Sequence, residues 1–286
     1  MKKLLMAIAA AMMLLGCEKD ENLTTAKADE PKDSVQEKTI TFTFGETTMH
    51  PMTRATLSEL NLTDLWLFDY VGGEYVQTIH QASTDDGFGA VSGTFDYGTH
   101  TLYFVASRGV NPTVSTDAKT ITWQTVRDTF WATLQMTVEP ATGGQQSVSL
   151  SRVVGRLRIT VTDAVPMGAA TFEVTPTTWY CGLNYQTGEA TASSTSPIVV
   201  NIPSSYIGTT KLASSVYTIS GGTPWETGIT AAIKASDNST LGSVTISDIP
   251  IQRNHITSYS GGIMTTGRSL SVSSADEWVE DDDVVW

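Results

Sequence analysis

The feature that most constrains the fold is a strict two-residue alternation of apolar and hydroxyl side chains. It is clearest in the stretch KTITFTFGE, where Ile40, Phe42 and Phe44 alternate with threonines. Because successive side chains of a β-strand point to opposite faces of the sheet, this pattern predicts a strand with one apolar face. Similar runs recur along the chain, so the sequence predicts an all-β protein, in which only residues 122–134 could hold a helical turn.

Turn residues divide these runs into two sets of strands. Gly72-Gly73 and Asp237-Asn238 predict hairpin turns, and a further turn is expected near Tyr97-Gly98. With 286 residues, the chain is long enough for two ordinary domains. The spacing of the strands therefore predicts an N-terminal β-sandwich over residues 38–146 and a C-terminal β-sandwich over residues 147–286.

The N-terminus has the pattern of a secretory signal. Lys2 and Lys3 precede an apolar run that is too short for a permanent membrane span, and LLGC matches the lipobox of bacterial lipoproteins. Residues 1–16 are therefore predicted to be a signal peptide, with Cys17 as the lipidated residue. Two acyl chains on such a cysteine give a stable anchor. The polar stretch 17–37 is predicted to be a flexible tether.

The four residues after the cysteine, EKDE, allow two interpretations. They resemble the lysine-plus-acidic signal that sends some lipoproteins to the outer face of the outer membrane, and they are also typical of a solvated acidic tether. Their position beside the lipidated cysteine favours export to the cell surface.

The composition argues against several functions. The chain has 17 basic and 30 acidic residues, a formal net charge of −13, which makes nucleic acid a poor partner. The four histidines are far apart, and no P-loop, Rossmann fingerprint or nucleophile elbow occurs. We therefore expect no enzyme, no metal site and no cofactor. Cys181, in an aromatic stretch without a partner cysteine, is interpreted as a buried core residue.

The seven tryptophans raise the alternative of glycan binding, because exposed aromatic side chains stack on sugar rings. Trp66 lies in an alternating strand run, where an aromatic residue is ordinarily part of the core. The pattern does not decide whether Trp123, Trp131 and Trp225 are buried or exposed.

Several segments, in their order along the chain, resemble the fimbrillins of Gram-negative anaerobes, the FimA-like subunits of type V pili. These segments are the lipobox LLGC, the strand TITFTF followed by TRAT, the central SLSRVVGRLRITV, and IPIQRNHITSYSGGI near the end. The resemblance implies two tandem transthyretin-like β-sandwich domains. It also implies export as a lipoprotein, trimming by an arginine-specific protease, and polymerisation with other pilus subunits by strand exchange.

Under this resemblance, Arg54-Ala55 in the stretch HPMTRAT is the expected cleavage site. Cleavage there would remove the lipid anchor together with residues 38–54, a propeptide that contains the strand side chains Ile40, Phe42 and Phe44. The alternative is an uncut loop arginine, since exposed polar loops often contain one.

The matching donor would be a C-terminal tail over residues 268–286. If the tail were one continuous strand, its apolar side chains would share one face, but Glu280 and Asp282 share that parity too. A bent strand or partial use of the tail therefore stays open. The apolar residues of the predicted donor face are Leu270, Val272, Trp278, Val284 and Trp286.

The sequence thus predicts a structural subunit of a cell-surface fimbria that supports adhesion. It would contact the outer membrane through its lipid until it is cleaved. Two alternatives remain: a lipid-anchored base subunit of the same pilus, and a surface lipoprotein that binds glycans.

Overall fold

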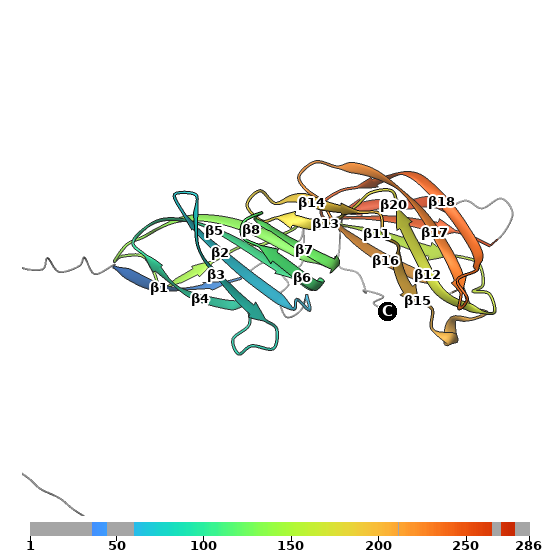
Figure 1. Cartoon of the computed structure of the whole chain (residues 1–286), viewed down its shortest axis with the longest axis horizontal. Coiled ribbons are helices and arrows are strands. Elements are labelled where there is room, and N and C mark those ends of the chain that lie inside the picture. The colour runs from blue at the N-terminus through green and yellow to red at the C-terminus, as the bar shows by residue number, and fades with distance from the viewer. Residues whose placement is uncertain (1–35, 45–59, 211, 265–269, 278–286) are drawn as a thin grey trace, which may run out of the picture. The chain divides into compact units, whose positions relative to one another are not determined.

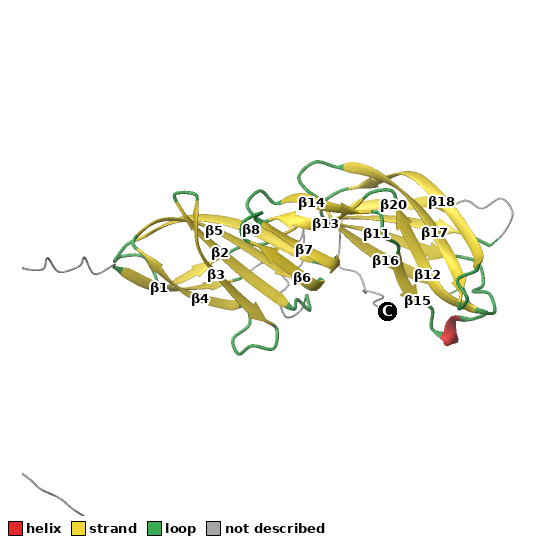
Figure 2. Ribbon diagram, in the orientation of Figure 1, coloured by secondary structure: helices red, strands yellow, loops and turns green. Residues whose placement is uncertain are grey.

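The computed structural model describes residues 36–44, 60–210, 212–264 and 270–277. These residues form twenty β-strands and one short 3₁₀ helix, η1 (Ser204–Tyr206), so the all-β prediction is confirmed (Figures 1 and 2). Gln36–Trp286 forms one compact unit. In the described part of the chain, no helix is long and apolar enough to cross a membrane.

The first β-sandwich consists of a three-stranded and a five-stranded sheet. The three-stranded sheet has the order β4-β1-β9, with β1 (Glu37–Thr43), β4 (Ala90–Asp96) and β9 (Gln145–Ser147). The five-stranded sheet has the order β10-β8-β5-β2-β3, with β2 (Asp64–Val71), β3 (Glu74–Ala82), β5 (Gly98–Ser107), β8 (Thr129–Val138) and β10 (Ser151–Arg152). One hydrophobic cluster contains buried residues from both sheets, including Phe42, Phe95 and Phe104.

The five-stranded sheet is buried on both faces at β2. Leu65 and Leu67 belong to the sandwich core, whereas Trp66, Phe68 and Tyr70 belong to a second cluster on the other side of the sheet. The prediction that Trp66 is a core residue is confirmed, since it is 3% exposed.

A four-stranded sheet packs against that second face, and its strands come from both halves of the chain. Its order is β14-β13-β7-β6, with β6 (Val110–Ser115), β7 (Thr120–Thr125), β13 (Trp179–Asn184) and β14 (Glu189–Ser194). The β6–β7 hairpin joins the β13–β14 hairpin through the antiparallel pairs from Gly182↔Thr122 to Asn184↔Thr120. This sheet crosses the predicted boundary at residue 146, and the division into two tandem domains stays a prediction.

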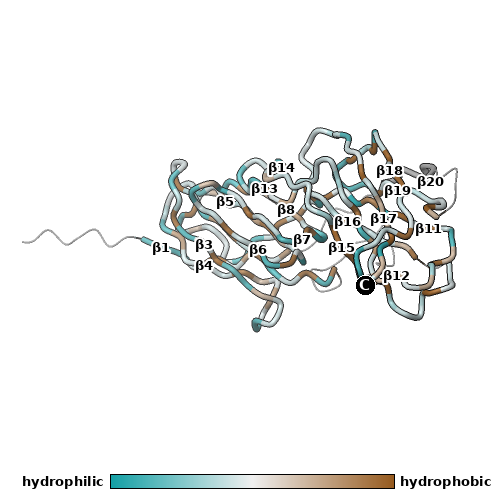
Figure 3. The backbone as a smooth tube through the Cα atoms, turned by 45° about the vertical axis from the view of Figure 1, so that its right-hand side comes forward, coloured by the Kyte–Doolittle hydropathy of each residue, from teal (hydrophilic) through white to brown (hydrophobic). Residues whose placement is uncertain are grey.

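The second β-sandwich packs two four-stranded sheets around another core. One sheet has the order β16-β11-β19-β20, with β11 (Val154–Val161), β16 (Ala213–Ile219), β19 (His255–Gly261) and β20 (Leu270–Glu277). The other has the order β15-β12-β17-β18, with β12 (Ala169–Pro176), β15 (Ile198–Asn201), β17 (Trp225–Ala235) and β18 (Thr240–Ile251). The core between these two sheets includes Leu157, Phe172 and Ile233. Figure 3 shows hydrophobic and hydrophilic residues interspersed along the strands.

The turn predictions have mixed outcomes. Gly72 and Gly73, with φ of 60° and 90°, form the β2–β3 hairpin turn, and Asn238, with φ of 66°, lies in the β17–β18 turn, so both are confirmed. The turn at Tyr97-Gly98 is present, but it joins strands of two different sheets rather than a hairpin. Residues 122–134 hold no helical turn. Residues 122–125 belong to β7, residues 129–134 belong to β8, and residues 126–128 connect the two strands.

Candidate assembly site

Strand β1 is the central strand of its sheet. It pairs with β4 in antiparallel register from Glu37↔Asp96 to Thr43↔Ala90, and with β9 in parallel register from Thr41↔Gln145 to Thr43↔Ser147. Neither β4 nor β9 pairs with any other described strand. The three-stranded sheet therefore depends entirely on the presence of β1.

The apolar face of β1 is completely buried, as the alternation predicts. Ile40 and Phe42 are both 0% exposed. The ring of Phe42 lies 5.7 Å from that of Phe95 and 5.3 Å from that of Phe104 between centroids, and the Phe44 ring lies 5.5 Å from the latter. Phe44 follows the end of β1 and is partly buried against the same cluster. These rings fix the position of β1 through apolar packing.

The polar side chains of β1 make a small number of hydrogen bonds. The hydroxyls of Thr41 and Ser92 are hydrogen-bonded at 2.7 Å, and Lys38 Nζ donates to the carbonyl of Pro140 at 2.8 Å. Exposed contacts of this kind contribute little to stability. The strand is therefore held mainly by its buried side chains and by the backbone ladders.

The predicted processing residues lie outside the described part of the chain. This applies to Cys17 and to Arg54 and Ala55. Other arginines are described: Arg152 in β10 is 3% exposed and Arg156 in β11 is 1% exposed. Buried, strand-paired arginines resist a protease, because its active site must accept several residues of extended backbone.

Part of the predicted donor tail forms strand β20 within its own sheet. Leu270 pairs with Gly261 and Val272 pairs with Tyr259 along the antiparallel β19–β20 ladder. Because β20 is an edge strand with one partner, its release would break a single ladder. Trp278, Val284 and Trp286 lie outside the described residues.

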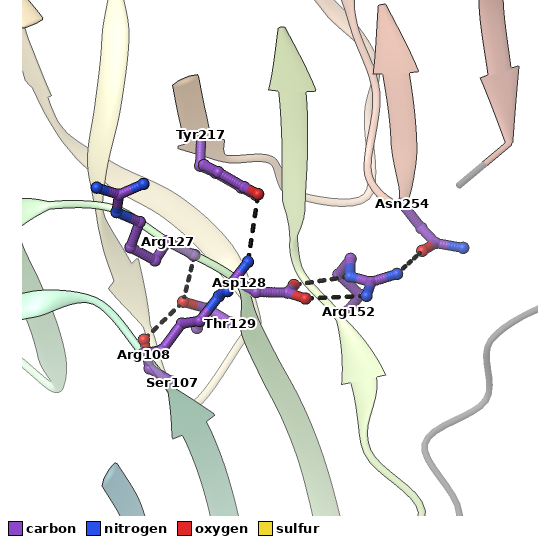
Figure 4. A network of polar contacts seen from close by, with 8 residues as sticks. All are labelled: Ser107, Arg108, Arg127, Asp128, Thr129, Arg152, Tyr217 and Asn254. Carbon is purple, nitrogen blue, oxygen red and sulfur yellow. Dashed lines mark hydrogen bonds and ion pairs between the residues drawn. The ribbon is translucent and has the colours of Figure 1, made fainter. Parts of the chain in front are cut away.

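A buried ion pair joins the β7–β8 connection to β10 and the β18–β19 turn (Figure 4). Arg152 Nε donates to Asp128 Oδ1 at 2.7 Å, and its Nη2 donates to Oδ2 at 2.9 Å. Its Nη1 donates to Asn254 Oδ1 at 3.0 Å, and the guanidinium carbon lies 4.9 Å from the centre of the Phe130 ring. A two-pronged arginine–carboxylate contact of this kind fixes the orientation of all three segments.

A tyrosine pair connects β2 to the residue after β13. The hydroxyls of Tyr70 and Tyr185 are hydrogen-bonded at 2.8 Å, and the Tyr185 ring stacks on Phe68 at 3.8 Å between centroids. Burial, together with the hydrogen bond to Tyr70, raises the pKa of Tyr185 well above its usual value. The Tyr185 hydroxyl therefore serves as a neutral hydrogen-bonding group in the packed cluster.

The prediction that Cys181 is a core residue needs correction. Its side chain is partly buried, and its thiol donates to the carbonyl of Ala192 at 2.8 Å. The side chain packs against the second cluster from its rim and also lines a pocket. Burial raises the pKa of the Cys181 thiol, which disfavours the reactive thiolate.

The three undecided tryptophans differ in burial. Trp123 is 3% exposed, whereas Trp131 and Trp225 are intermediate. None of them is a fully exposed stacking platform. In the described residues, no group of three or more His, Cys, Asp or Glu side chains could hold a metal ion.

Sequence reasoning missed the partners of β1. Gly93 faces Ile40 across the β1–β4 ladder, and a side chain at Gly93 would collide with Ile79 and Phe95. The pairing with β9 was also missed, because QQS has no apolar alternation to indicate a strand. The alternation in residues 90–96 indicated a strand, but it did not indicate that this strand pairs with β1.

The fold and this site define an all-β sandwich protein whose N-terminal strand is the centre of one sheet. Residues 98–285 match a family of unknown function, DUF6562. Since the match spans more than half of the chain, the chain belongs to this family. No curated protein matches the chain.

Solved structures share the fold at low sequence identity. A candidate adhesin from Bacteroides ovatus matches with a TM-score of 0.51 and 11% identity, over 83% of this chain and 96% of that chain. A candidate polysaccharide-binding protein (DUF1812) from Bacteroides thetaiotaomicron matches with a TM-score of 0.52 and 11% identity, over 82% of this chain and 96% of that chain. At this identity the likeness shows a common fold.

Proposed function

We propose that this chain is a structural subunit of a cell-surface fimbria. It is exported as a lipoprotein on Cys17, cut by an arginine-specific protease after Arg54, and polymerised by exchange of a strand between subunits. The polymer then supports adhesion. The FimA-like character of the sequence and the fold shared with candidate adhesins support this proposal.

The observation that carries the proposal is the central position of β1 combined with its place near the N-terminus. The strand ends at Thr43 and the described segment at Phe44, and Arg54 lies between Phe44 and the next described residue, Leu60. One cut after Arg54 would therefore separate β1 from everything that follows. The rings of Phe95 and Phe104 would then lose their cover, at a cost of roughly 1.5–3 kcal/mol for each large apolar side chain exposed.

An incoming strand must replace β1 in a defined way. It must pair with β4 in antiparallel register and with β9 in parallel register, and it must present apolar side chains at every second position. The C-terminal tail 268–286 of another copy carries apolar residues on one parity, and polar residues on the same parity interrupt them, so only part of the tail would fill the groove. The apolar residues are Leu270, Val272, Trp278, Val284 and Trp286. Because donor and acceptor lie near opposite ends of the chain, the contact is heterologous and extends into a filament.

Cleavage and assembly are tested with the variant Arg54→Ala. An arginine-specific protease should convert the wild-type chain to one that begins at Ala55, and filaments should follow in electron micrographs. The variant should stay a folded monomer, because β1 continues to fill its sheet. As a matched control, Arg158→Ala should be cut and should assemble like wild type.

Assembly of Arg54→Ala as readily as wild type would contradict the proposed maturation. A lipid-anchored base subunit is the alternative outcome, and it would retain acylated Cys17 and its own β1 in filaments taken from cells.

A further inference from the structure

A pocket of about 580 Å³ opens beside the second β-sandwich. Its walls come from the edge strands β15 and β16, from β13, from β7 and the segment that follows it, and from the connection between β14 and β15. Its volume lies within the range of about 300–1,000 Å³ that is typical of small-molecule sites. The pocket is separate from the β1 sheet, since no residue of β1, β4 or β9 lines it.

Two buried polar atoms of the pocket walls have no hydrogen-bond partner among the described residues. They are Oγ of Ser214, a residue 2% exposed, and Nε1 of Trp123, a residue 3% exposed. Unpaired buried polar atoms are rare in native proteins, and a bound ligand is one way in which they are satisfied. Ser214 offers the pocket a hydroxyl, which donates or accepts, whereas Nε1 of Trp123 lies against Gly109.

The pocket is also positively charged, although the protein as a whole is acidic. Arg127 lines it, makes no hydrogen bond or ion pair with another described side chain, and extends away from the Asp128–Arg152 pair in Figure 4. Arg108 Nη2 donates to the hydroxyl of Tyr217 on the pocket wall at 3.3 Å. No Asp or Glu is among the described residues that line the pocket.

A third arginine contributes positive charge beside the Ser215 and Tyr217 wall. Arg156 Nε donates to Ser215 Oγ at 3.0 Å, and its guanidinium carbon lies 5.7 Å from the centre of the Tyr217 ring. The positive side chains of Arg108 and Arg156 therefore both approach the ring of Tyr217. In a confined site such charges favour an anionic ligand.

The remaining walls combine serine, threonine and glutamine side chains with the indole rings of Trp123 and Trp179, and with aliphatic side chains of β15, β16 and the segment after β7. Hydroxyl and amide groups match a ligand rich in hydroxyls, and a guanidinium matches a carboxylate in two-pronged geometry. We infer that this pocket binds an acidic saccharide, with its carboxylate on Arg127 and a ring hydroxyl at Ser214. This inference goes beyond the proposed function, because it concerns a monomer and requires neither cleavage nor assembly.

The inference is tested by calorimetry and tryptophan fluorescence on the purified full chain. The probes are digalacturonic acid and N-acetylneuraminic acid, with galactobiose as the neutral counterpart. At least one acidic probe should bind and change the fluorescence, because two tryptophans line the pocket, and galactobiose should bind at least about tenfold more weakly. Arg127→Gln should weaken acidic binding by about tenfold, the loss expected for a charged hydrogen-bonded contact.

Two serine variants separate ligand binding from folding. Ser214→Ala and Ser220→Ala each remove a buried hydroxyl without a hydrogen-bond partner among the described residues, but only Ser214 lines the pocket. Ser214→Ala should weaken binding by about threefold, the effect of one neutral hydrogen bond, while Ser220→Ala should bind like wild type. Thermal unfolding should show both variants folded.

Several results would overturn the inference. They are the absence of binding by both acidic probes at millimolar concentration, equal binding of galactobiose, and equal effects of the two serine variants. Arg127-dependent binding of a synthetic peptide of residues 278–286, without binding of either acidic sugar, would assign the pocket to an acidic peptide instead.

Discussion

At the scale of single residues, Phe42 is the side chain that most firmly holds β1 in place. It is fully buried, it contacts the rings of Phe95 and Phe104, and it lies in the middle of the strand that we propose is exchanged. The same ring therefore determines the stability of the uncut subunit and the specificity of the groove for an incoming strand.

We expect Phe42→Ala to lower the free energy of unfolding by about 3–5 kcal/mol, the cost of deleting a large buried ring. Urea unfolding of the uncut chain measures this change. The neighbouring variant Thr41→Ala removes one exposed hydrogen bond, to Ser92, and should cost about 1 kcal/mol or less. Equal effects of the two variants would show that β1 is not anchored by its apolar face.

The sequence predicts the burial of individual side chains well where alternation is strict. Ile40 and Phe42 are buried as expected. One face of β1 packs on the core and the other is more exposed, so alternation alone identifies the buried residues. Trp123 stayed undecided, and Cys181 was assigned to the core although it lies at the rim. Their burial depends on which hairpin packs over them, and periodicity within one strand carries no information on that partner.

At the scale of elements, β1 and β20 have contrasting places in their sheets. β1 is central and indispensable to its sheet, whereas β20 is an edge strand that, among the described strands, pairs with β19 alone. In the proposed exchange the central strand leaves and a C-terminal segment replaces it. The nine residues after Glu277 can be removed without touching the β19–β20 ladder.

Deletion of residues 278–286 should leave folding intact and abolish polymerisation, since Trp278, Val284 and Trp286 are lost while β20 is kept. Circular dichroism and electron microscopy of the protease-treated chain check the two outcomes. Independently, a synthetic KTITFTFGE peptide added to cleaved subunits should refill the groove and compete with the incoming tail. A truncated chain that polymerises, or one that fails to fold, would show that the tail does not act as the donor.

The elements themselves were more predictable than their partners. Strands and hairpin turns follow from local alternation and turn residues, as in β1 and the Gly72-Gly73 turn. The sheet that unites β7 with β13 was not foreseen, because pairing between strands some 60 residues apart leaves no local pattern. The sequence likewise could not predict the unpaired polar atoms of Ser214 and Trp123, because only the folded structure brings these two residues to one pocket.

At the scale of the whole molecule, the buried Asp128–Arg152 pair connects segments that are far apart in the chain. The guanidinium also bonds Asn254 in the β18–β19 turn, so it fixes β10 to the second β-sandwich. Such a contact restrains the first set of strands relative to the second. It also removes Arg152 from the reach of an arginine-specific protease.

We expect Arg152→Met to lower the free energy of unfolding by about 3–5 kcal/mol, because it leaves the Asp128 carboxylate buried without its partner. The double variant Asp128→Leu/Arg152→Met should recover much of this loss, since no unpaired charge remains. Arg127→Met is the matched control, and it should change stability by about 0.5 kcal/mol or less. Urea unfolding measures these changes. If Arg152→Met lowered the free energy of unfolding as little as Arg127→Met, the result would contradict a structural role for the pair.

In the proposed assembly, β1 is removed and a strand of another subunit takes its place. Mass spectrometry of the mature N-terminus, in filaments isolated from the native cells, tests it most directly. If cleavage occurs after Arg54, the chain in the filament should begin at Ala55, and residues 38–54 should be absent from the polymer. Filaments built from chains that retain acylated Cys17 and the KTITFTFGE strand would contradict it.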